Sequence, residues 1–276
     1  MSQFVSLKNV GKTYANKVIF SNITLSVEQG KPVVIMGRNG CGKSTLLKII
    51  TGVLSHTEGE IIRAPKIKTS FVPDRFPKLP FSVREYILHM GRIQGISDSD
   101  VNRYMDFQFE YLDIPQNIKD QKIYKCSKGT IQKINIMQAF LLKSDLLVMD
   151  EPFSGLDEGS IERLIELLTK TSEDGVAMVL SCHEKVLAQR VTDNIFAFSG
   201  QSLVKNQDNS NHLRIKFVAN TSNINNGIFD FLDDKVIFIN TIDELYEILV
   251  DKDRLKEVLF LLFENGYEIY SINPVS

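Results

Sequence analysis

Residues 37–45 are the feature that most constrains the fold of this 276-residue chain. They read Gly37-Arg-Asn-Gly-Cys-Gly-Lys-Ser-Thr45, which matches the phosphate-binding pattern G-x-x-x-x-G-K-[ST] at every defined position. The short apolar run Val33 to Met36 predicts a buried strand before the loop, and Ser44 to Thr51 predicts a helix that Gly52 ends. A strand, a glycine-rich loop and a helix in this order indicate an α/β protein whose loop holds the phosphates of a nucleotide.

Each residue type in this loop has a chemical reason to be there. The glycines let successive backbone N–H groups turn toward phosphate oxygens, and the following helix directs its positive end at the same anion. Lys43 is expected to place its charge on the outer phosphates, the Ser44 hydroxyl to hold Mg²⁺, and Thr45 to bind the α-phosphate. The other predicted ATP-binding positions of the loop are Gly37, Asn39, Gly40, Cys41 and Gly42. A glycine-rich turn that only caps a helix would not need a lysine followed by two hydroxyl residues.

Two adjacent carboxylates end a second apolar run further along the chain. Leu146 to Met149 predicts another buried strand, and Asp150 and Glu151 follow it directly, at the strand end where ligands of parallel sheets bind. Asp150 is expected to hold Mg²⁺ directly or through water, and Glu151 to polarise the water that attacks the nucleotide. Standing alone, such a pair could instead cap a helix or be solvated. Its position after a complete phosphate loop favours the catalytic interpretation.

The order of predicted elements indicates a mostly parallel sheet. Residues 1–36 read as strands, and a block of helical periodicity extends from Phe76 to Ser144. Further elements are predicted as strands at Glu60 to Ile62, Ile67 to Val72 and Val176 to Leu180, and as a helix at Gly159 to Thr171. Strands alternating with helices predict a sheet covered on both faces, into which the helical block is inserted.

A second, smaller unit is predicted from Asn209 onward. Strands are expected at His212 to Ala219, Lys235 to Asn240, Leu245 to Val250 and Tyr267 to Ile272, with helices at Asn223 to Leu232 and from a cap at Asp251 to Glu264. The order β-α-β-β-α-β predicts a ferredoxin-like α+β module over residues 209–276, after a larger domain of residues 1–208. The module carries no catalytic spacing, and two interpretations stay open: it only stabilises the assembly, or it regulates it or docks a partner.

Charge and composition exclude several function classes. The chain has 32 Lys and Arg against 34 Asp and Glu, and the basic residues are scattered, so no nucleic-acid partner is expected. No apolar run reaches the roughly 20 residues that cross a bilayer, and the first residues lack the layout of a secretion signal. Three cysteines, Cys41, Cys126 and Cys182, form no disulfide or zinc pattern, which predicts a reducing cytosol.

With the loop and the carboxylate pair, the later motifs resemble those of the ATP-binding cassette (ABC) ATPases over residues 1 to about 205. In chain order the matching elements are Tyr14 for the adenine-stacking aromatic, Gly37 to Thr45 for the phosphate loop, Cys126-Ser-Lys-Gly-Thr130 for the signature L-S-G-G-Q, Leu146 to Glu151 for the Walker B strand, Ser154-Gly-Leu-Asp157 for the D-loop, and His183 for the switch histidine. Each motif alone is weak, whereas the ordered set is specific.

The resemblance implies a fold and a reaction. The fold is a P-loop NTPase with a RecA-like parallel sheet, an N-terminal antiparallel β subdomain and an inserted α-helical subdomain, here followed by the small C-terminal α+β module. The reaction is Mg²⁺-dependent ATP hydrolysis, in which Glu151 and His183 place the water and Tyr14 and Val18 contact ATP. Outside the family register, His183 would be interpreted as a structural histidine.

The resemblance also implies a dimer. Two cassette subunits, identical or different, pair head to tail, so that Ser127 and the Gly129 N–H face the γ-phosphate held by the partner subunit, while Asp157 belongs to the D-loop. Taken alone, Ser127 would be an ordinary helix cap.

Two departures from the family pattern stand out. Asp74 occupies the position of a glutamine that reaches Mg²⁺ and senses the membrane partner; as an acceptor-only carboxylate it either binds the metal differently or serves the coupling surface. The signature reads C-S-K-G-T, with Lys128 in place of the first glycine, a substitution that many exporter-type cassettes carry.

The family's main role predicts a membrane partner. We expect an ATPase subunit at the cytoplasmic face of the cell membrane, bound to a separate transmembrane permease subunit and driving export. The apolar patch Phe76, Leu79, Phe81 and Tyr86 could receive a helix of that partner, or it could close the helical block's own core. The alternative is a soluble ABC ATPase acting on a macromolecular or cofactor-assembly complex. The absence of a cassette repeat and of long coiled-coil heptads argues against the ribosome and DNA-repair forms.

Overall fold

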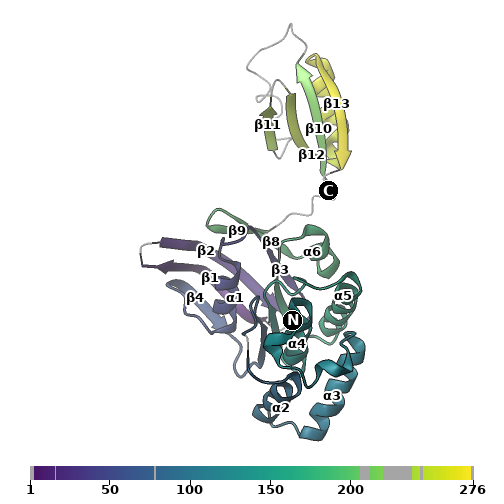
Figure 1. Ribbon diagram of the computed structural model, residues 1–276. Helices are drawn as coiled ribbons and strands as arrows, with labels where there is room; N and C mark the ends of the chain where they lie inside the picture. The colour runs from purple at the N-terminus through teal and green to yellow at the C-terminus, as the bar shows by residue number, and fades with distance from the viewer. Residues whose placement is uncertain are drawn as a thin grey trace. The chain divides into compact units, whose positions relative to one another are not determined.

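The structure is a computed structural model that describes residues 3–15, 17–77, 79–205, 212–219, 238–242 and 245–274. It divides the chain into two compact units, Met1–Asn206 and Gln207–Ser276 (Figure 1). Each unit has its own hydrophobic core, as expected of separate domains.

A six-stranded sheet forms the centre of the first unit. Its strands are β3 (Val33–Met36), β5 (Thr69–Val72), β6 (Leu146–Met149), β7 (Ala177–Cys182), β8 (Ile195–Ser199) and β9 (Ser202–Lys205). They lie in the order β5-β6-β7-β3-β8-β9, and all neighbours run parallel except β8 and β9. All residues of β6 and β7 are buried, because helices and a second sheet cover the two faces. The predicted parallel sheet is thus present.

Alternate residues of β3 show how the two faces are covered. Val33 and Ile35 pack with α1 (Lys43–Thr51) and the amino-terminal strands, whereas Val34 packs with α5 (Glu158–Glu173) and α6 (Lys185–Val191). Figure 1 shows these helices on either side of the sheet. The phosphate loop therefore begins at the middle of a sheet that is held from both sides.

The amino-terminal strands form a second, antiparallel sheet. It consists of β1 (Gln3–Tyr14), β2 (Lys17–Glu28) and β4 (Glu58–Arg63), in the order β2-β1-β4. Inward residues such as Val5, Leu7 and Phe20 are fully buried against α1. This sheet is the antiparallel subdomain expected beside the parallel one.

The inserted block is helical. It contains α2 (Val83–Ile93), α3 (Asp98–Tyr111) and α4 (Lys128–Phe140), with 3₁₀ turns at Gln116–Ile118 and Ile123–Lys125. Ser82 and Glu85 form a capping box at the start of α2, and Ser97 caps α3. The apolar residues predicted from helical spacing, among them Val83, Ile87, Val101, Met105, Phe109, Ile134 and Met137, gather in one core.

The second unit contains a four-stranded antiparallel sheet. Its elements are β10 (His212–Ala219), β11 (Phe238–Ile242), β12 (Leu245–Asp251), α8 (Leu255–Glu264) and β13 (Tyr267–Pro274), and the strand order is β11-β12-β10-β13. Ile215, Phe217, Ile248 and Val250 of the sheet pack against Val258 and Leu262 of α8. The predicted helix Asn223 to Leu232 lies outside the described residues, so the ferredoxin-like assignment stays a proposal.

One prediction for this unit is wrong in detail. Asp251 was expected to cap the last helix, but it ends β12, and a 3₁₀ turn at Lys252–Arg254 separates it from α8. The capping position of α8 is Arg254, which makes no side-chain cap.

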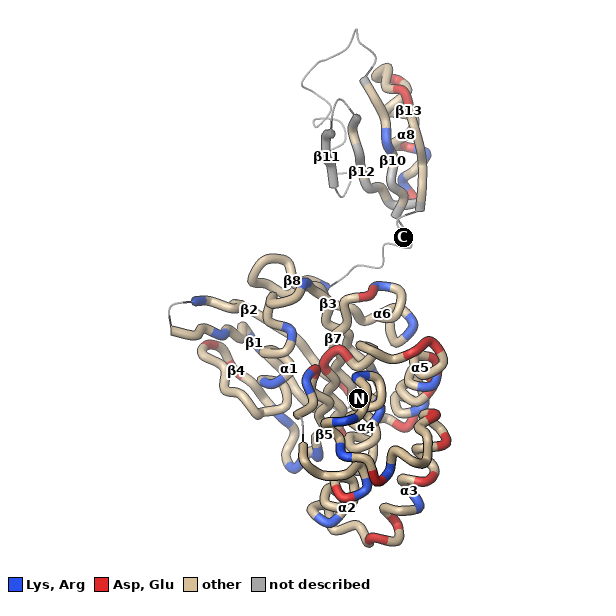
Figure 2. The backbone as a smooth tube through the Cα atoms, in the orientation of Figure 1, with Lys and Arg blue, Asp and Glu red and all other residues tan. Residues whose placement is uncertain are grey.

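Charges are mixed over the surface of the first unit. Figure 2 shows Lys and Arg interspersed with Asp and Glu along its helices and loops. None of the helices within the described ranges is both long and apolar enough to cross a bilayer.

Candidate active site

The phosphate loop joins β3 to α1 and is shaped by its glycines. Gly40 and Gly42 have φ angles of 81° and 113°, a backbone region that disfavours residues with a Cβ atom. A Cβ atom at Gly42 would lie 2.9 Å from the Ile19 side chain. Gly42 is also the N-terminal cap of α1, and no side chain caps that end, so its first N–H groups remain available to an anion.

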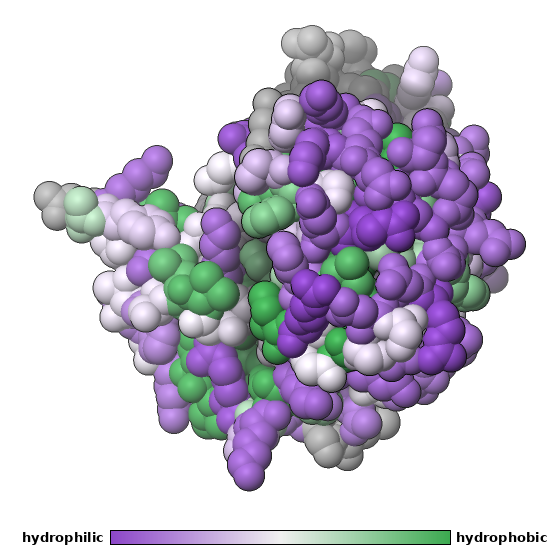
Figure 3. Space-filling model, turned by 60° about the horizontal axis from the view of Figure 1, so that its bottom comes forward, coloured by the Kyte–Doolittle hydropathy of each residue, from purple (hydrophilic) through white to green (hydrophobic). Residues whose placement is uncertain are grey.

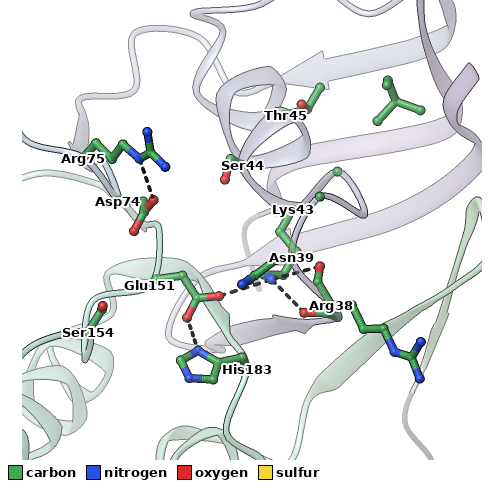
Figure 4. Close-up of a pocket in the computed structure, with 14 residues that line it drawn as sticks. Arg38, Asn39, Lys43, Ser44, Thr45, Asp74, Arg75, Glu151, Ser154 and His183 are labelled. Carbon is green, nitrogen blue, oxygen red and sulfur yellow. Dashed lines mark hydrogen bonds and ion pairs between the residues drawn. The ribbon is translucent and has the colours of Figure 1, made fainter. Parts of the chain in front are cut away.

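A cleft of about 690 Å³ opens over this loop (Figure 4). Its lining includes the predicted residues Gly37, Asn39, Gly40, Gly42, Lys43, Ser44, Thr45, Asp74, Glu151 and His183. Segments distant in sequence thus meet at one place, as expected for the carboxyl end of a parallel sheet. Ser154, the first residue of the D-loop, also lines the cleft. Ile19, Arg38 and Arg75 line it as well and were missed, because no part of the motif pattern requires them.

Lys43 is almost fully buried at the base of the cleft, with an exposed fraction of 6%. Its Nζ donates to the carbonyl oxygen of Gly37 at 2.7 Å and lies 3.2 Å from Oε1 of Glu151. The second contact is an ion pair without hydrogen-bond geometry, since Oε1 has no hydrogen-bond partner among the described residues. The Glu151 carboxylate therefore offsets the charge of the buried lysine.

Glu151 lies between Lys43 and His183 (Figure 4). Its Oε2 is 2.8 Å from Nδ1 of His183, so one carboxylate oxygen faces the lysine and the other faces the histidine. The Glu151 backbone has a positive φ of 48°, and its N–H donates to Ser181 Oγ at 2.8 Å. This strained conformation, held by a buried hydroxyl, directs the side chain into the cleft.

Asp150 lies behind the cleft and is not part of its lining. It is 2% exposed, and its Oδ1 accepts a hydrogen bond of 2.6 Å from Ser181 Oγ. Ser181 was missed from sequence, because a serine at the end of an apolar strand has no distinguishing pattern. The hydroxyl joins the two acids, since it donates to Asp150 and accepts from the Glu151 backbone.

The polar groups at the cleft suit a magnesium ion bound together with a nucleotide. In the described part of the chain, no three His, Cys, Asp or Glu side chains gather as a metal cage. Mg²⁺ does not need one, because it binds through one or two protein oxygens, substrate phosphates and waters. Ser44 and Asp74 at the cleft supply oxygens of this kind, with Asp150 behind them.

Asp74 reaches the cleft from the end of β5. Its side chain is 44% exposed and lies 3.9 Å from Nε of Arg75, which is itself 95% exposed. The position is compatible with both interpretations made from sequence, a metal ligand or a coupling residue.

Three other predicted ATP-binding residues do not line the cleft. Tyr14 and Val18 are 46% and 40% exposed, and Lys12 Nζ lies 4.8 Å from the centre of the Tyr14 ring. Cys41 points back into the loop, where its Sγ occupies the space that a Cβ atom at Gly37 would need. The residue after Val18, Ile19, lines the cleft instead.

The signature residues lie at a second cavity of about 240 Å³, whose lining includes Ser127, Gly129 and Asp157. Ser127 caps α4, since its Oγ accepts from Thr130 N at 3.1 Å. A Cβ atom at Gly129 would lie 2.6 Å from the carbonyl oxygen of Gly155, so only glycine allows this approach of the D-loop. No residue is shared between this lining and that of the phosphate cleft.

Two contacts join the signature helix to the D-loop. Lys128 Nζ donates to Ser154 Oγ at 3.0 Å, and Lys133 Nζ lies 3.4 Å from Oδ2 of Asp157. Asp157 caps α5, and hydrogen bonds from Ser160 lower the pKa of its carboxyl group to about 2. The lysine that departs from the family signature thus contacts a residue of the nucleotide cleft.

An apolar groove of about 450 Å³ lies on the helical block. Its lining is Leu79, Phe81, Tyr86, His89, Met90, Arg92 and Ile93. Figure 3 shows apolar residues between polar ones on the face of the molecule that includes this block. Of the predicted patch, Leu79, Phe81 and Tyr86 line the groove, whereas Phe76 packs edge-on against Tyr86 at a ring-centre distance of 5.3 Å.

Comparison with known proteins agrees with this geometry. A profile of the ABC transporter family matches residues 20–154. The zinc import ATP-binding protein ZnuC of Pseudomonas fluorescens is 30% identical over 195 residues, which cover 69% of this chain and 72% of that protein. ZnuC of Rickettsia conorii is 29% identical over 202 residues, covering 71% and 83%.

Solved structures show the same fold. An ATP-binding cassette dimer in a post-hydrolysis state with ADP and Pi has a TM-score of 0.65 at 26% identity, covering 73% of this chain and 98% of that one. An ABC transporter ATP-binding subunit has a TM-score of 0.66 at 24% identity, covering 75% and 91%. ABC ATPases generally use ATP with Mg²⁺. The chain therefore belongs to the ABC transporter family, as one of its ATP-hydrolysing, ATP-binding subunits.

Proposed function

We propose that this chain couples ATP-driven pairing of two cassettes to movement of a substrate through a separate membrane-spanning subunit. The observation that carries the proposal is the position of Glu151, held between Lys43 and His183 at one end of the nucleotide cleft. A carboxylate so placed can accept a proton from water that attacks a phosphate bound on the loop.

In the proposed reaction, Lys43 binds the γ-phosphate in place of the Glu151 carboxylate. The released carboxylate then orients the attacking water, while His183 keeps its hydrogen bond to Oε2 and fixes the direction of the side chain. The N-terminus of α1 offsets charge on the phosphates. Bound Mg²⁺ would supply further neutralisation of the phosphate charge, with Ser44, Asp150 and Asp74 as the residues proposed to hold it.

Pairing of two chains would complete each site. Ser127 and Gly129 lie at a cavity separate from their own cleft, which suits contact with the nucleotide of a second cassette. Ser127 Oγ takes up only the Thr130 N–H at the start of α4, so the other first N–H groups of this helix are proposed to face the partner's γ-phosphate. The second chain is proposed to be identical or closely related.

The membrane partner is proposed to dock in the apolar groove of the helical block. Ile93 at its rim is 79% exposed, and an exposed aliphatic side chain beside an apolar groove favours a helix of another protein as the occupant. The chain would then lie at the cytoplasmic face of the membrane through this contact. For the direction of transport we propose export, on the resemblance of Lys128 to exporter-type signatures; the zinc import relatives give the opposite expectation.

Substitution of Glu151 tests the catalytic assignment. Glu151→Gln should keep Mg·ATP binding and lose turnover by about 10²–10³-fold, because the amide cannot accept the proton. Lys43→Ala should instead weaken binding itself. Binding is measured by calorimetry and turnover by phosphate release from the purified complex. Near-normal turnover of Glu151→Gln would refute the assignment.

Substitution in the groove tests the membrane partner. Ile93→Glu places a charge at the groove rim and should abolish co-purification of a polytopic membrane protein from detergent extracts. Phe107→Glu is the matched control, because Phe107 is 61% exposed on α3 and lies outside the groove. If the unsubstituted chain co-purifies only with a soluble assembly complex, the soluble alternative replaces the transporter proposal. The direction follows from whether inside-out vesicles of the complex take up or release substrate when ATP is added.

A further inference from the structure

Helix α4 holds the loop that carries Glu151. Gln132, on a buried face of the helix, donates from Nε2 to the carbonyl oxygen of Pro152 at 2.9 Å and approaches that of Glu151 at 3.5 Å. The side chain is 6% exposed, so no solvent competes for these carbonyls. Pro152 follows Glu151 and lies outside β6, so strand pairing gives its carbonyl oxygen no donor. The Gln132 side chain supplies the donor instead.

The same helix holds the loop that carries Asp74. Asn135, three residues after Gln132, donates from Nδ2 to the carbonyl oxygen of Pro73 at 2.8 Å. Asn135 is fully buried, and its Nδ2 also lies 3.5 Å from Oε1 of Gln132. The two amides are thus in contact with each other and with both acidic loops of the cleft.

The stability of the fold alone does not explain an asparagine at position 135. Its Oδ1 is buried and has no hydrogen-bond partner among the described residues. An unpaired buried polar atom typically costs about 1–3 kcal/mol, a cost that leucine of similar size would avoid. The amide at this position is therefore explained by the hydrogen bond that its other end gives to Pro73.

The start of α4 is tied to the cleft as well. The helix begins at the signature residue Ser127, and Lys128 in its first turn donates to Ser154 Oγ at the edge of the nucleotide cleft. A shift of α4 relative to the sheet must therefore move both acidic loops or break these hydrogen bonds.

We infer that Gln132 and Asn135 are positioning residues for ATP hydrolysis, which hold the backbones next to Glu151 and Asp74 in register with the signature helix. The inference rests on the proposed role of Glu151 in placing the water. Neither amide touches the nucleotide cleft, so both act through the loops they hold. Contact of α4 with the partner's nucleotide thereby sets the position of the residues that act on the chain's own nucleotide.

Apolar replacements of similar size test the inference on the full chain. Gln132→Met and Asn135→Leu should each lower kcat by about 10–100-fold, because a small displacement of a catalytic group has effects of this size. The affinity for Mg·ATP should stay close to that of the unsubstituted protein, since the phosphate loop is untouched. Each variant leaves a carbonyl oxygen without its donor, so kcat is compared well below the melting temperature of every protein. Turnover is measured at saturating Mg·ATP, and the affinity by calorimetry.

Gln138 provides the matched control. It lies three residues after Asn135 on the same helix and donates to the carbonyl oxygen of Phe71 at 3.1 Å. Phe71 belongs to β5, which pairing with β6 already holds in place, so Gln138→Met should leave kcat unchanged. The inference is overturned if Gln132→Met and Asn135→Leu keep normal kcat, if Gln138→Met loses as much, or if the loss follows unfolding at the assay temperature or a fall in Mg·ATP affinity. Should Asn135→Leu not fold, Gln132→Met decides by the same criteria.

Glu151→Gln separates this inference from the proposed function. If Glu151→Gln is inactive while Gln132→Met and Asn135→Leu turn over normally, only the positioning role fails. If Glu151→Gln itself turns over normally, the assignment of the water-placing residue fails first.

Discussion

At the scale of single residues, an ion pair joins Lys43, the proposed phosphate-binding lysine, to Glu151, the proposed catalytic carboxylate. The lysine Nζ is 3.2 Å from the Glu151 carboxylate and 2.7 Å from the Gly37 carbonyl oxygen. In the proposed reaction, a phosphate displaces the carboxylate from the lysine. Binding of ATP is therefore proposed to compete with this ion pair.

This competition predicts how substitutions change affinity for ATP. Glu151→Gln removes the charge opposite Lys43, so the Kd for ATP without Mg²⁺ should fall by about 3- to 10-fold, the effect of roughly 1 kcal/mol of lost competition. His183→Ala is the control, because it leaves the Lys43–Glu151 pair in place. Calorimetric titration of both proteins gives the comparison, and equal Kd values would show that the pair does not oppose binding.

At the scale of elements, three motifs of the site lie at the N-termini of helices. The uncapped N-terminus of α1 faces the phosphate loop, Ser127 caps α4 at the signature, and Asp157 caps α5 at the D-loop. The helix-end motifs are short and local, which is why sequence alone located them. Their partners across the fold were not predictable in the same way.

The cap of α5 gives a pH-dependent prediction. The folded-state pKa of Asp157 is about 2, below its ordinary value of 3.8, so its contribution to stability is present above about pH 4 and is lost as pH falls toward 2. Asp157→Ala should lower the urea midpoint at pH 7 by the equivalent of about 1 kcal/mol, and the difference from the unsubstituted protein should shrink below pH 4. Asp174→Ala is the control, because Asp174 lies at the other end of α5 and its cap hydrogen bonds come from the backbone N–H, which alanine keeps. A difference that stays constant from pH 7 to pH 3 would contradict the assignment.

The difference between local motifs and contacts across the fold explains what sequence analysis could and could not predict. The phosphate loop, the carboxylate pair and the parallel sheet follow from local patterns. The structure brings residues 37–45 except Cys41 to one cleft with Glu151 and His183. Ser181, Gln132 and Asn135 act through contacts between segments far apart in the chain, and nothing in their local sequence marks them. Asp251 was predicted as a cap from local preference, but strand pairing with β10 extends through it.

At the scale of the whole molecule, the chain consists of two units with separate cores. The second unit has its own buried cluster around Phe217, Ile248 and Leu262. Three of its aromatic residues, Phe260, Phe263 and Tyr270, are exposed. Stability and activity of the first unit need not depend on it.

Truncation tests that independence. A chain of residues 1–206 should keep its Mg·ATP affinity and one thermal transition, whereas the full chain should show a second transition from the smaller unit. Differential scanning calorimetry distinguishes the two. If truncation leaves the ATPase rate, dimerisation and partner binding unchanged, the regulatory interpretation of the second unit fails. A fall in any of them while Mg·ATP affinity stays normal would support it.

The separation of the signature cavity from the nucleotide cleft has a genetic consequence. Ser127 and Gly129 share no cavity with the Lys43 of their own chain, so in the proposed pairing each subunit contributes one half to each of two catalytic centres. An allele whose product pairs normally but cannot hydrolyse ATP would sequester wild-type subunits in unproductive complexes. Loss-of-function alleles at Glu151 are therefore expected to be dominant, whereas alleles that prevent folding are expected to be recessive.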